Sequence, residues 1–411
     1  MTTVSRPPAP AATWLRRNLF RTPFDSVLTV ILAPLSAYLL FRFARFVFVT
    51  GRWEIVEVNL KLLMVGNWPA AHLPRLAVAL VVIGTVSGLI AGLVHARQVR
   101  RGTATSLGQS RRKRLLDLAR RFGLLIATVV LLLALTSTIG PTLTAAGVFG
   151  GAVIGRIVGG FLGRRTFPKP LMIVAAIVLV ALPFLLYLYL VDAVPLANWQ
   201  GFWFNLSSAF AGIILCFPLG VLLAIGRRSD LPLLRGVSTV YIELVRGAPL
   251  FVLLLMAHVA LEFFVPVTMA PSRPVRAIVV FTIFTAAYLA EIVRGGLQSV
   301  PRGQEEAAKA LGLSPFKQMT RIVLPQALRN VIPAQIGQFI SLFKDTVLAG
   351  LAMSILDMAG VAQAITQQDV FRGQRLIVET LAFTAFLFWV GSYTMSRESQ
   401  RLERKLGVGT R

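Results

Sequence analysis

The sequence predicts an all-α integral membrane protein with about ten transmembrane helices. Of its 411 residues, 56% are hydrophobic and 14% are charged, whereas about a quarter of the residues in a typical soluble protein are charged. The apolar residues are grouped in runs of about twenty, which is the length a helix needs to cross a bilayer. Because these runs are continuously apolar and do not alternate, the pattern is not that of a β-barrel.

Ten apolar runs are long enough to be spans. They cover residues 26–48, 74–95, 122–140, 144–163, 171–191, 203–226, 239–265, 275–295, 331–352 and 376–396. The segment 96–121 carries nine Lys and Arg residues, and we expect it to be cytoplasmic because basic loops stay on that side. Counting outward from this segment places the other basic clusters and both termini on the same side. Those clusters lie at 16–21, 164–169, 227–228, 296–330 and 401–405.

The net charge of +25 does not indicate nucleic-acid binding, because the basic residues flank apolar runs, where they contact lipid headgroups. The single cysteine, Cys216, lies inside an apolar run, so no internal disulfide is expected. His72, His95 and His258 are far apart in the sequence, so we expect no metal site. No arrangement of residues typical of a catalytic site stands out either.

We expect three parts along the chain. Residues 1–25 form a cytoplasmic lead-in, whose Pro- and Ala-rich start, Met1–Ala12, is expected to be disordered. No cleavable signal is expected, because the first apolar run is too long for a signal-peptide core. Residues 26–195 hold five spans with few polar groups, and residues 196–411 hold five spans interrupted by polar motifs.

Glycines recur every four residues in the fourth predicted span, at Gly147, Gly151, Gly155, Gly159 and Gly163. On a helix they form a stripe that allows a neighbouring backbone to approach closely, so we expect helix packing there. A role in conduction is the alternative. Arg156 lies on the same helix, and we expect it to face protein or a polar crevice because charge in lipid is costly.

The cytoplasmic segment 301–330 has the pattern of a helix–turn–helix that projects from the membrane. Pro301 and Gly303 interrupt the preceding helix, and residues 304–311 are strong helix formers. Gly312 suits the left-handed residue that ends a helix, while Ser314 and Pro315 suit the start of the next one. Its small and charged residues fit a docking surface, although a generic amphipathic loop has the same shape.

The residues of this segment are more specific than its shape. Glu306-Ala307-Ala308, followed by Gly312, Ile322, Leu324 and Pro325, resembles the EAA-loop signature of ABC importer permeases. Residues 241–250 and 287–304 resemble the "E-x-x-R-G-x-P" and "A-Y-x-A-E-x-x-R-G-G" stretches of polar amino acid permeases. Residues 343–348 resemble their "K-D-T-S-L" element, with Val347 in place of the usual Ser. With its extra N-terminal spans, the chain is similar in length and topology to general L-amino acid permeases of the AapM/BztC/NatH kind. Those chains are longer than the five-span permeases of the HisM/GlnP type.

The resemblance implies a five-helix MetI-like permease core at 196–411 in the bacterial inner membrane. It also implies a second homologous permease, so that the pair is a heterodimer, together with two ATPase subunits on the EAA loops. A periplasmic binding protein would deliver an amino acid. The coupling residues would be Glu305, Glu306, Ala307, Ala308, Gly312, Ile322, Leu324 and Pro325. This chain has no phosphate-cradling loop, so it is not expected to be an enzyme, and ATP and Mg²⁺ would bind the partner ATPases.

Ionisable residues at membrane depth are the remaining candidates, because such residues are usually functional or paired. Glu243 and Arg246, like Glu291 and Arg294, are three residues apart on a helix face, so each pair fits a local ion pair. The alternative is recognition of a zwitterionic amino acid along the substrate path, to which Tyr288 also belongs. Lys344 and Asp345 are adjacent and point in different directions, so we expect a gate or an interhelical contact there.

Other classes of protein fit the sequence less well. A secondary transporter usually shows internal repeats and broken helices, but the two halves of this chain share no motif. A membrane enzyme would carry clustered titratable groups at one membrane face, and the sequence shows no such cluster. An ABC importer for another polar solute, such as an opine, stays open, because the sequence does not identify the cargo.

Overall fold

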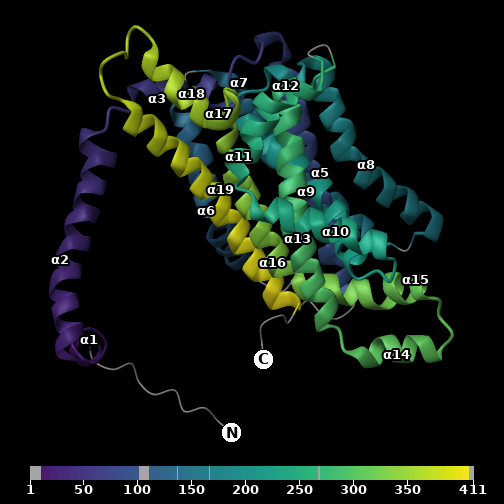
Figure 1. The fold of residues 1–411 in the computed structure, drawn as a ribbon. Helices are drawn as coiled ribbons and strands as arrows, with labels where there is room; N and C mark the ends of the chain where they lie inside the picture. The colour runs from purple at the N-terminus through teal and green to yellow at the C-terminus, as the bar shows by residue number, and fades with distance from the viewer. Residues whose placement is uncertain (1–10, 101–110, 137, 166, 267–268, 407–411) are drawn as a thin grey trace. The chain divides into compact units, whose positions relative to one another are not determined.

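The computed structural model describes residues 11–100, 111–136, 138–165, 167–266 and 269–406 (Figure 1). The described residues are helical and contain no β-strand, only an isolated bridge between Gly201 and Asp357. The predicted all-α class is therefore confirmed. Met1 to Pro10, which belong to the predicted disordered start, and part of the basic segment 96–121 lie outside the described residues.

The chain divides into two compact units, residues 1–54 and 55–411. The first unit contains α1 (Ala11–Leu19) and α2 (Pro23–Arg45), which continues as the π-helical turn η1 (Phe46–Thr50). Thr22 caps α2 by accepting a hydrogen bond from the backbone N–H of Asp25 at 3.1 Å. The apolar stretch Pro23–Thr50 is long enough to cross a membrane, as predicted for residues 26–48.

The second unit begins with short helices and four long ones. They are α3 (Glu54–Val58), α4 (Leu60–Val65), η2 (Ala70–His72), α5 (Leu73–Arg100), α6 (Arg111–Ala134), α7 (Ile139–Leu162) and α8 (Lys169–Ala193). The chain continues through η3 (Leu196–Asn198), α9 (Gly201–Arg227), α10 (Pro232–Gly247), α11 (Leu250–Leu255), η4 (Met256–Ala260), α12 (Leu261–Phe264) and α13 (Arg273–Ser299).

The last part follows α13 without a long loop. It consists of α14 (Arg302–Ala310), α15 (Pro315–Gln318), η5 (Met319–Val323), α16 (Leu324–Asp345), α17 (Leu348–Met353), α18 (Met358–Ala364), η6 (Ile365–Gln367) and α19 (Ile377–Leu406). Within this unit, α14 and α15 lie at one end of the long helices, and α17 and α18 lie at the other (Figure 1).

Each of the ten predicted spans overlaps at least one helix, but fewer helices are long and apolar enough to be a continuous span. Seven helices of the described residues are long and apolar enough, and the pair α10 and α11–η4 makes an eighth if its 102° bend lies within one span. The two other predicted runs, 122–140 and 331–352, are not among these candidate spans, each for its own reason. The apolar part of α6 is short, covering Phe122–Ala134. Along α16, the apolar pattern is interrupted by Arg329, Gln335 and Lys344.

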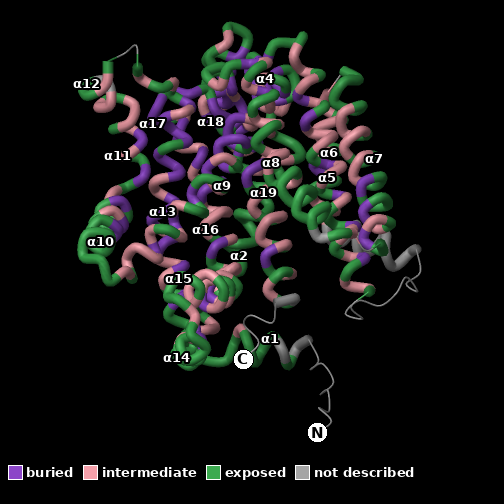
Figure 2. Tube along the Cα trace, turned by 90° about the vertical axis from the view of Figure 1, so that its right-hand side faces the viewer, coloured by how far each residue is buried: buried purple, intermediate pink, exposed green. Residues whose placement is uncertain are grey.

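The core of the second unit lies along α13, which packs on α9 and α16 and is the most buried of the candidate spans (Figure 2). One apolar cluster joins the two halves of the sequence. Trp68, Leu76 and Leu190 from the N-terminal half pack with Phe204 and Phe281 from the C-terminal half. Residues on both sides of position 196 thus share a core, while the division of the chain at that position stays a prediction.

Four aromatic rings reinforce this junction. Trp199 packs against Tyr187, Trp203 and Trp68, with ring centroids 5.1, 5.7 and 5.8 Å apart. Trp68 and Trp199 are fully buried. Such aromatic pairs add about 0.5–1.5 kcal/mol each beyond the area they bury, so they stabilise the contact of Trp68 and Tyr187 with the start of α9.

The predicted glycine stripe of α7 packs against α5, which confirms the interpretation as helix packing. A Cβ at Gly155 would lie 2.0 Å from the carbonyl oxygen of Thr85, and one at Gly159 would lie 2.1 Å from that of Leu89. Gly88 on α5 is equally close to Ala152. The two backbones are therefore in direct contact, which only residues without a side chain permit. The order of these contacts shows that α5 and α7 run parallel.

Candidate functional site

Five charged residues gather where α9, α10 and α13 meet, and we call them the ionic cluster. They are Arg227, Glu243, Arg246, Glu291 and Arg294. Glu291 lies at the centre. Arg294, one turn further along α13, donates to both of its carboxylate oxygens, at 2.8 Å from Nη2 and 3.2 Å from Nε. Arg227 at the end of α9 also donates to Glu291.

Arg227 connects the two acidic residues. Its Nη2 donates to Glu243 on α10 at 2.7 Å, while its Nη1 bonds Glu291 on α13. The side chain of Glu291 is 16% exposed and that of Arg227 is 22% exposed, so this contact is largely shielded from water. Shielding makes the loss of one partner costly, because the other charge is then left without compensation.

Arg246 is held more loosely than the other two arginines. Its guanidinium lies 3.8 Å from Glu291 and is 36% exposed, and it stacks at 5.3 Å over the ring of Tyr288. Tyr288 in turn packs on Phe284 at 4.9 Å. Three guanidinium groups and two carboxylates leave one net positive charge in the ionic cluster, and Arg246 is the cation least neutralised by a carboxylate.

The structure thus brings together all five predicted substrate-path residues: Glu243, Arg246, Tyr288, Glu291 and Arg294. It does not test their role. Sequence reasoning missed Arg227, which it used only as a marker of orientation. Of the two predicted local pairs at spacing three, Glu291–Arg294 forms. Glu243 is instead bonded by Arg227, and no contact described joins it to Arg246. In this arrangement Glu291 is engaged by guanidinium groups, so it can bind an ammonium group only if one of them moves.

Lys344 and Asp345 are not part of the ionic cluster. They end α16, which starts beside α14, so they lie at the opposite end of the long helices. Lys344 is exposed and Asp345 is half-buried, which agrees with the expectation that neighbouring residues point in different directions. Their predicted role as a gate or an interhelical contact stays a prediction.

A buried polar node that the sequence did not reveal lies next to Asp345. Asn205 on α9 donates to Asp357 at 3.2 Å and to Thr346 at 3.3 Å, and it accepts from the N–H of Met358 at 3.0 Å. Asp357 also caps α18 by accepting from the N–H of Gly360 at 2.8 Å. Burial raises the pKa of Asp357 to about 6, against hydrogen bonds that lower it. This node ties α9, α16 and α18 together.

The predicted coupling loop forms at the end of the helices where α9 and α13 finish. Helix α14 begins at Arg302, slightly earlier than predicted, and Gly312 has the expected left-handed φ of 72°. Ser314 occupies the N-cap position but makes no side-chain cap, and α15 is a single turn that continues through the π-helical turn η5 into α16. The second helix of the predicted motif is therefore the start of α16 and not a separate element.

The predicted coupling residues divide into buried supports and an exposed surface. Ala308 is buried, Ile322 and Leu324 are half-buried, and Glu305 lies 3.5 Å from Arg228 at the end of α9. The remaining four predicted residues are exposed; these are Glu306, Ala307, Gly312 and Pro325. Beside them, Leu311 and Phe316 expose 80% and 76% of their surface. An exposed apolar pair rimmed by charge is typical of a protein interaction surface.

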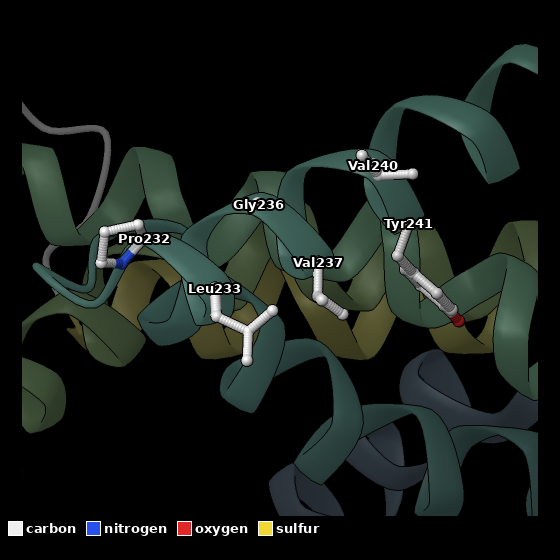
Figure 3. Close-up of a pocket in the computed structure, with 6 residues that line it drawn as sticks. All are labelled: Pro232, Leu233, Gly236, Val237, Val240 and Tyr241. Carbon is white, nitrogen blue, oxygen red and sulfur yellow. The ribbon is translucent and has the colours of Figure 1, made fainter.

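A shallow pocket of about 780 Å³ lies along the outer face of α10 (Figure 3). It is lined by Pro232, Leu233, Gly236, Val237, Val240 and Tyr241. The Tyr241 hydroxyl is the only polar side-chain group among them, and it donates to the carbonyl oxygen of Ile283 at 2.8 Å. This lining offers no charge for the ammonium or carboxylate of an amino acid, so the ionic cluster is the better candidate site.

Comparison with known proteins assigns the C-terminal part of the chain to a protein family. The family model for the binding-protein-dependent transport system inner membrane component matches residues 216–408. The Escherichia coli K12 inner membrane amino-acid ABC transporter permease protein YhdY is 38% identical over 221 residues, which are 54% of this chain and 59% of YhdY. The Rhodobacter capsulatus glutamate/glutamine/aspartate/asparagine transport system permease protein BztC is 38% identical over 222 residues, 52% of this chain and 51% of BztC.

A shorter relative is matched over most of its length. The Corynebacterium glutamicum glutamate transport system permease protein GluD is 33% identical over 212 residues, which are 51% of this chain and 74% of GluD. The chain spans about half the length of the first two relatives. These matches confirm the resemblance that the motifs at 241–250, 287–304 and 306–325 indicated. The chain belongs to the family of inner membrane components of binding-protein-dependent transport systems.

Proposed function

We propose that this chain is the permease subunit of an ATP-binding-cassette importer that carries amino acids across the bacterial inner membrane. The observation that carries the proposal is the coupling loop, which presents Glu306, Ala307, Leu311 and Phe316 to a partner. Membership of the family and the amino-acid permeases among its relatives support it. Both termini and the coupling loop are assigned to the cytoplasm, where basic segments are retained.

The assembly that we propose contains two ATPase subunits, a second homologous permease and a periplasmic binding protein. The ATPases dock on the coupling loop and supply the ATP and Mg²⁺ chemistry, whereas this chain supplies the translocation path. Movement of the docked loop reaches the membrane part through Glu305, whose carboxylate lies 3.5 Å from Arg228 at the end of α9. Arg228 follows Arg227, so the loop is one residue away from the ionic cluster.

The ionic cluster is the proposed contact for the substrate. An amino acid presents a carboxylate, and guanidinium groups bind carboxylates with strong, directional hydrogen bonds. Arg246 is the arginine least engaged with Glu291, so it is the group best placed to receive that carboxylate. Glu291 is then free to exchange one of its guanidinium partners for the substrate's ammonium group.

Reconstitution tests this function directly. The chain is placed in proteoliposomes with its cognate second permease, ATPase and binding protein, and uptake of labelled amino acids is measured with and without ATP. We expect uptake only when ATP, ATPase and binding protein are all present. Uptake by the permeases without the ATPase would show a secondary transporter. ATP-dependent uptake of an opine in place of amino acids would keep the importer but replace the cargo.

A further inference from the structure

Arg156 is an exposed charge in the middle of an apolar helix. It lies within α7, a candidate membrane span, and its side chain is exposed, whereas the sequence predicts that it faces protein or a polar crevice. The side chain of Arg156 has no hydrogen bond, ion pair or ring contact among the described residues. Its neighbours Val153, Ile154, Ile157 and Val158 are 42–67% exposed, so this face of α7 suits contact with acyl chains.

The position of Arg156 along α7 decides what it can reach. Residue 156 is six positions before the helix end at Leu162, about 9 Å at 1.5 Å per residue. An arginine covers much of such a distance by extending its aliphatic stem through the apolar layer toward the headgroups. An uncompensated charge in the apolar layer is costly, so the guanidinium is stabilised where it reaches the headgroup layer at the level of the helix end, and an anionic group there adds to this.

That end of α7 can be located within the second unit. Leu76, near the start of α5, shares an apolar cluster with Trp199 and Phe204 at the start of α9. Helix α5 therefore starts at the end of the long helices where α9 starts, and α7 runs parallel to α5. Because α9 finishes beside α14, the last turn of α7 lies at the α14 end of the long helices.

No acidic residue of the surrounding sequence compensates Arg156. Between Asp117 and Asp192 the chain contains no Asp or Glu. Arg164 and Arg165 follow at the end of the same helix, and both are exposed. Arg165 stacks over the ring of Phe161 at 4.6 Å, while Arg164 has no side-chain partner among the described residues. Arg156 and Arg164 therefore present exposed positive charge for which the described residues offer no acidic partner.

We propose that Arg156, together with Arg164, binds the phosphate of an anionic phospholipid in the leaflet at the α14 end of α7. The exposed apolar side chains around Arg156 receive the acyl chains, and the two guanidinium groups receive the headgroup. Each basic side chain near an anionic surface contributes about 1 kcal/mol. Loss of one arginine should therefore weaken retention of the lipid about fivefold. This inference is independent of the transported substrate.

Native mass spectrometry of the full chain tests the proposal, after exchange from vesicles of phosphatidylcholine mixed with phosphatidylglycerol. We expect the wild type to retain phosphatidylglycerol in preference to phosphatidylcholine. Arg156→Gln should retain about fivefold less, while Arg156→Lys, which keeps the charge, should retain most of it. Arg75→Gln is the matched control, because Arg75 pairs with Asp192 at 3.0 Å at the opposite end of α5, and it should behave like the wild type.

Three results would overturn the proposal. Equal retention by the wild type and Arg156→Gln would remove Arg156 from the lipid site. Displacement of the lipid by inorganic phosphate at modest concentration would show a site for free phosphate instead. A photoreactive residue at position 157 that captures a protein subunit and no lipid would show that this face of α7 is a protein interface.

Discussion

Arg227, the last residue of α9, forms an ion pair with Glu291 in the second half of α13, sixty-four positions further along the chain. The same guanidinium bonds Glu243 on α10 at 2.7 Å. One side chain thus fixes the relative positions of three helices. Because Arg228 contacts the coupling loop directly beside it, the ionic cluster and the coupling loop are mechanically adjacent.

Replacing Arg227 with Ala should weaken this junction. Glu243 and Glu291 would each lose a guanidinium partner, and we expect the free energy of unfolding to fall by about 1–2 kcal/mol for such partly shielded pairs. Thermal unfolding in detergent measures the change. Arg235→Ala is the control, because Arg235 is an exposed residue of α10 outside the ionic cluster. An equal loss in both variants would contradict a specific role for Arg227.

Glu291→Gln should impair uptake more than assembly of the transporter. The substitution keeps the shape of the side chain but leaves three arginines facing one carboxylate, Glu243. The double variant Glu291→Gln with Arg294→Gln restores the original net charge of the ionic cluster. If only charge balance matters, the double variant should recover uptake, whereas a direct role of the carboxylate predicts no recovery. Unchanged uptake kinetics in Glu291→Gln would remove this residue from the translocation path.

Gly312→Val should uncouple ATP hydrolysis from transport. Gly312 has a φ of 72°, which a β-branched residue adopts only with strain of about 1–3 kcal/mol. A Cβ there would meet no neighbouring atom, so the effect is confined to the backbone of the turn. Gly303→Val is the control, because it also has open space and lies inside α14. Normal ATPase binding and coupled uptake in Gly312→Val would contradict the docking assignment.

Gly155→Ala should separate α5 from α7. The added Cβ would lie 2.0 Å from a backbone oxygen of Thr85, which neither helix can relieve without moving apart, and such overpacking costs about 1–3 kcal/mol. Gly150→Ala on the same helix meets nothing within 4 Å and replaces glycine by a better helix former, so it should not lower the unfolding temperature. A pair of cysteines across the two helices, cross-linked in the wild type and not in Gly155→Ala, would report the separation itself.

The polar node should make stability depend on pH. The pKa of Asp357 is raised by burial from 3.8 to about 6, so the folded state holds its proton more tightly than the unfolded state does. The stabilisation is complete below the unfolded value and is lost as the pH rises through about 6, at most about 3 kcal/mol in total. Chemical unfolding between pH 4 and pH 7 measures this slope, which Asp357→Asn should abolish.

The exposed residue Asp369 supplies the control for that experiment. Asp369→Asn should keep the slope of the wild type over the same pH range. Asn at position 357 still caps α18, but its amide faces the amide of Asn205, so the variant should be less stable than the wild type at pH 4. The difference should shrink toward pH 7. A slope that survives in Asp357→Asn would assign it to another group.

Local patterns explain what the sequence predicted. The turn at Gly312 and the packing of Gly155 depend on backbone conformation and size at single positions, so residue type and spacing suffice. The same rule would have found the partner stripe on α5, since Gly84, Gly88 and Gly92 also recur every four residues. In each case the physical cause lies within one helix or one turn.

Features that depend on tertiary packing were not predictable in the same way. Arg227 pairs with Glu291 only because α9 and α13 lie side by side, and helix spacing alone favoured the local pairs. The node at Asp357 joins residues 152 positions apart. The bend of 102° between α10 and α11 occurs at Gly247-Ala248-Pro249, a sequence that breaks a helix. The hydropathy pattern alone predicts a single apolar span over residues 239–265.

The aromatic junction at the start of α9 also gives this protein an intrinsic optical signal. Three of its six tryptophans, Trp68, Trp199 and Trp203, lie in one cluster, and two of them are shielded from water. Their coupled rings should dominate the near-ultraviolet circular dichroism and shift the fluorescence emission to short wavelength. Detachment of Trp68 and Tyr187 from the start of α9 would therefore be visible without any label, even while the far-ultraviolet signal of the helices stays constant.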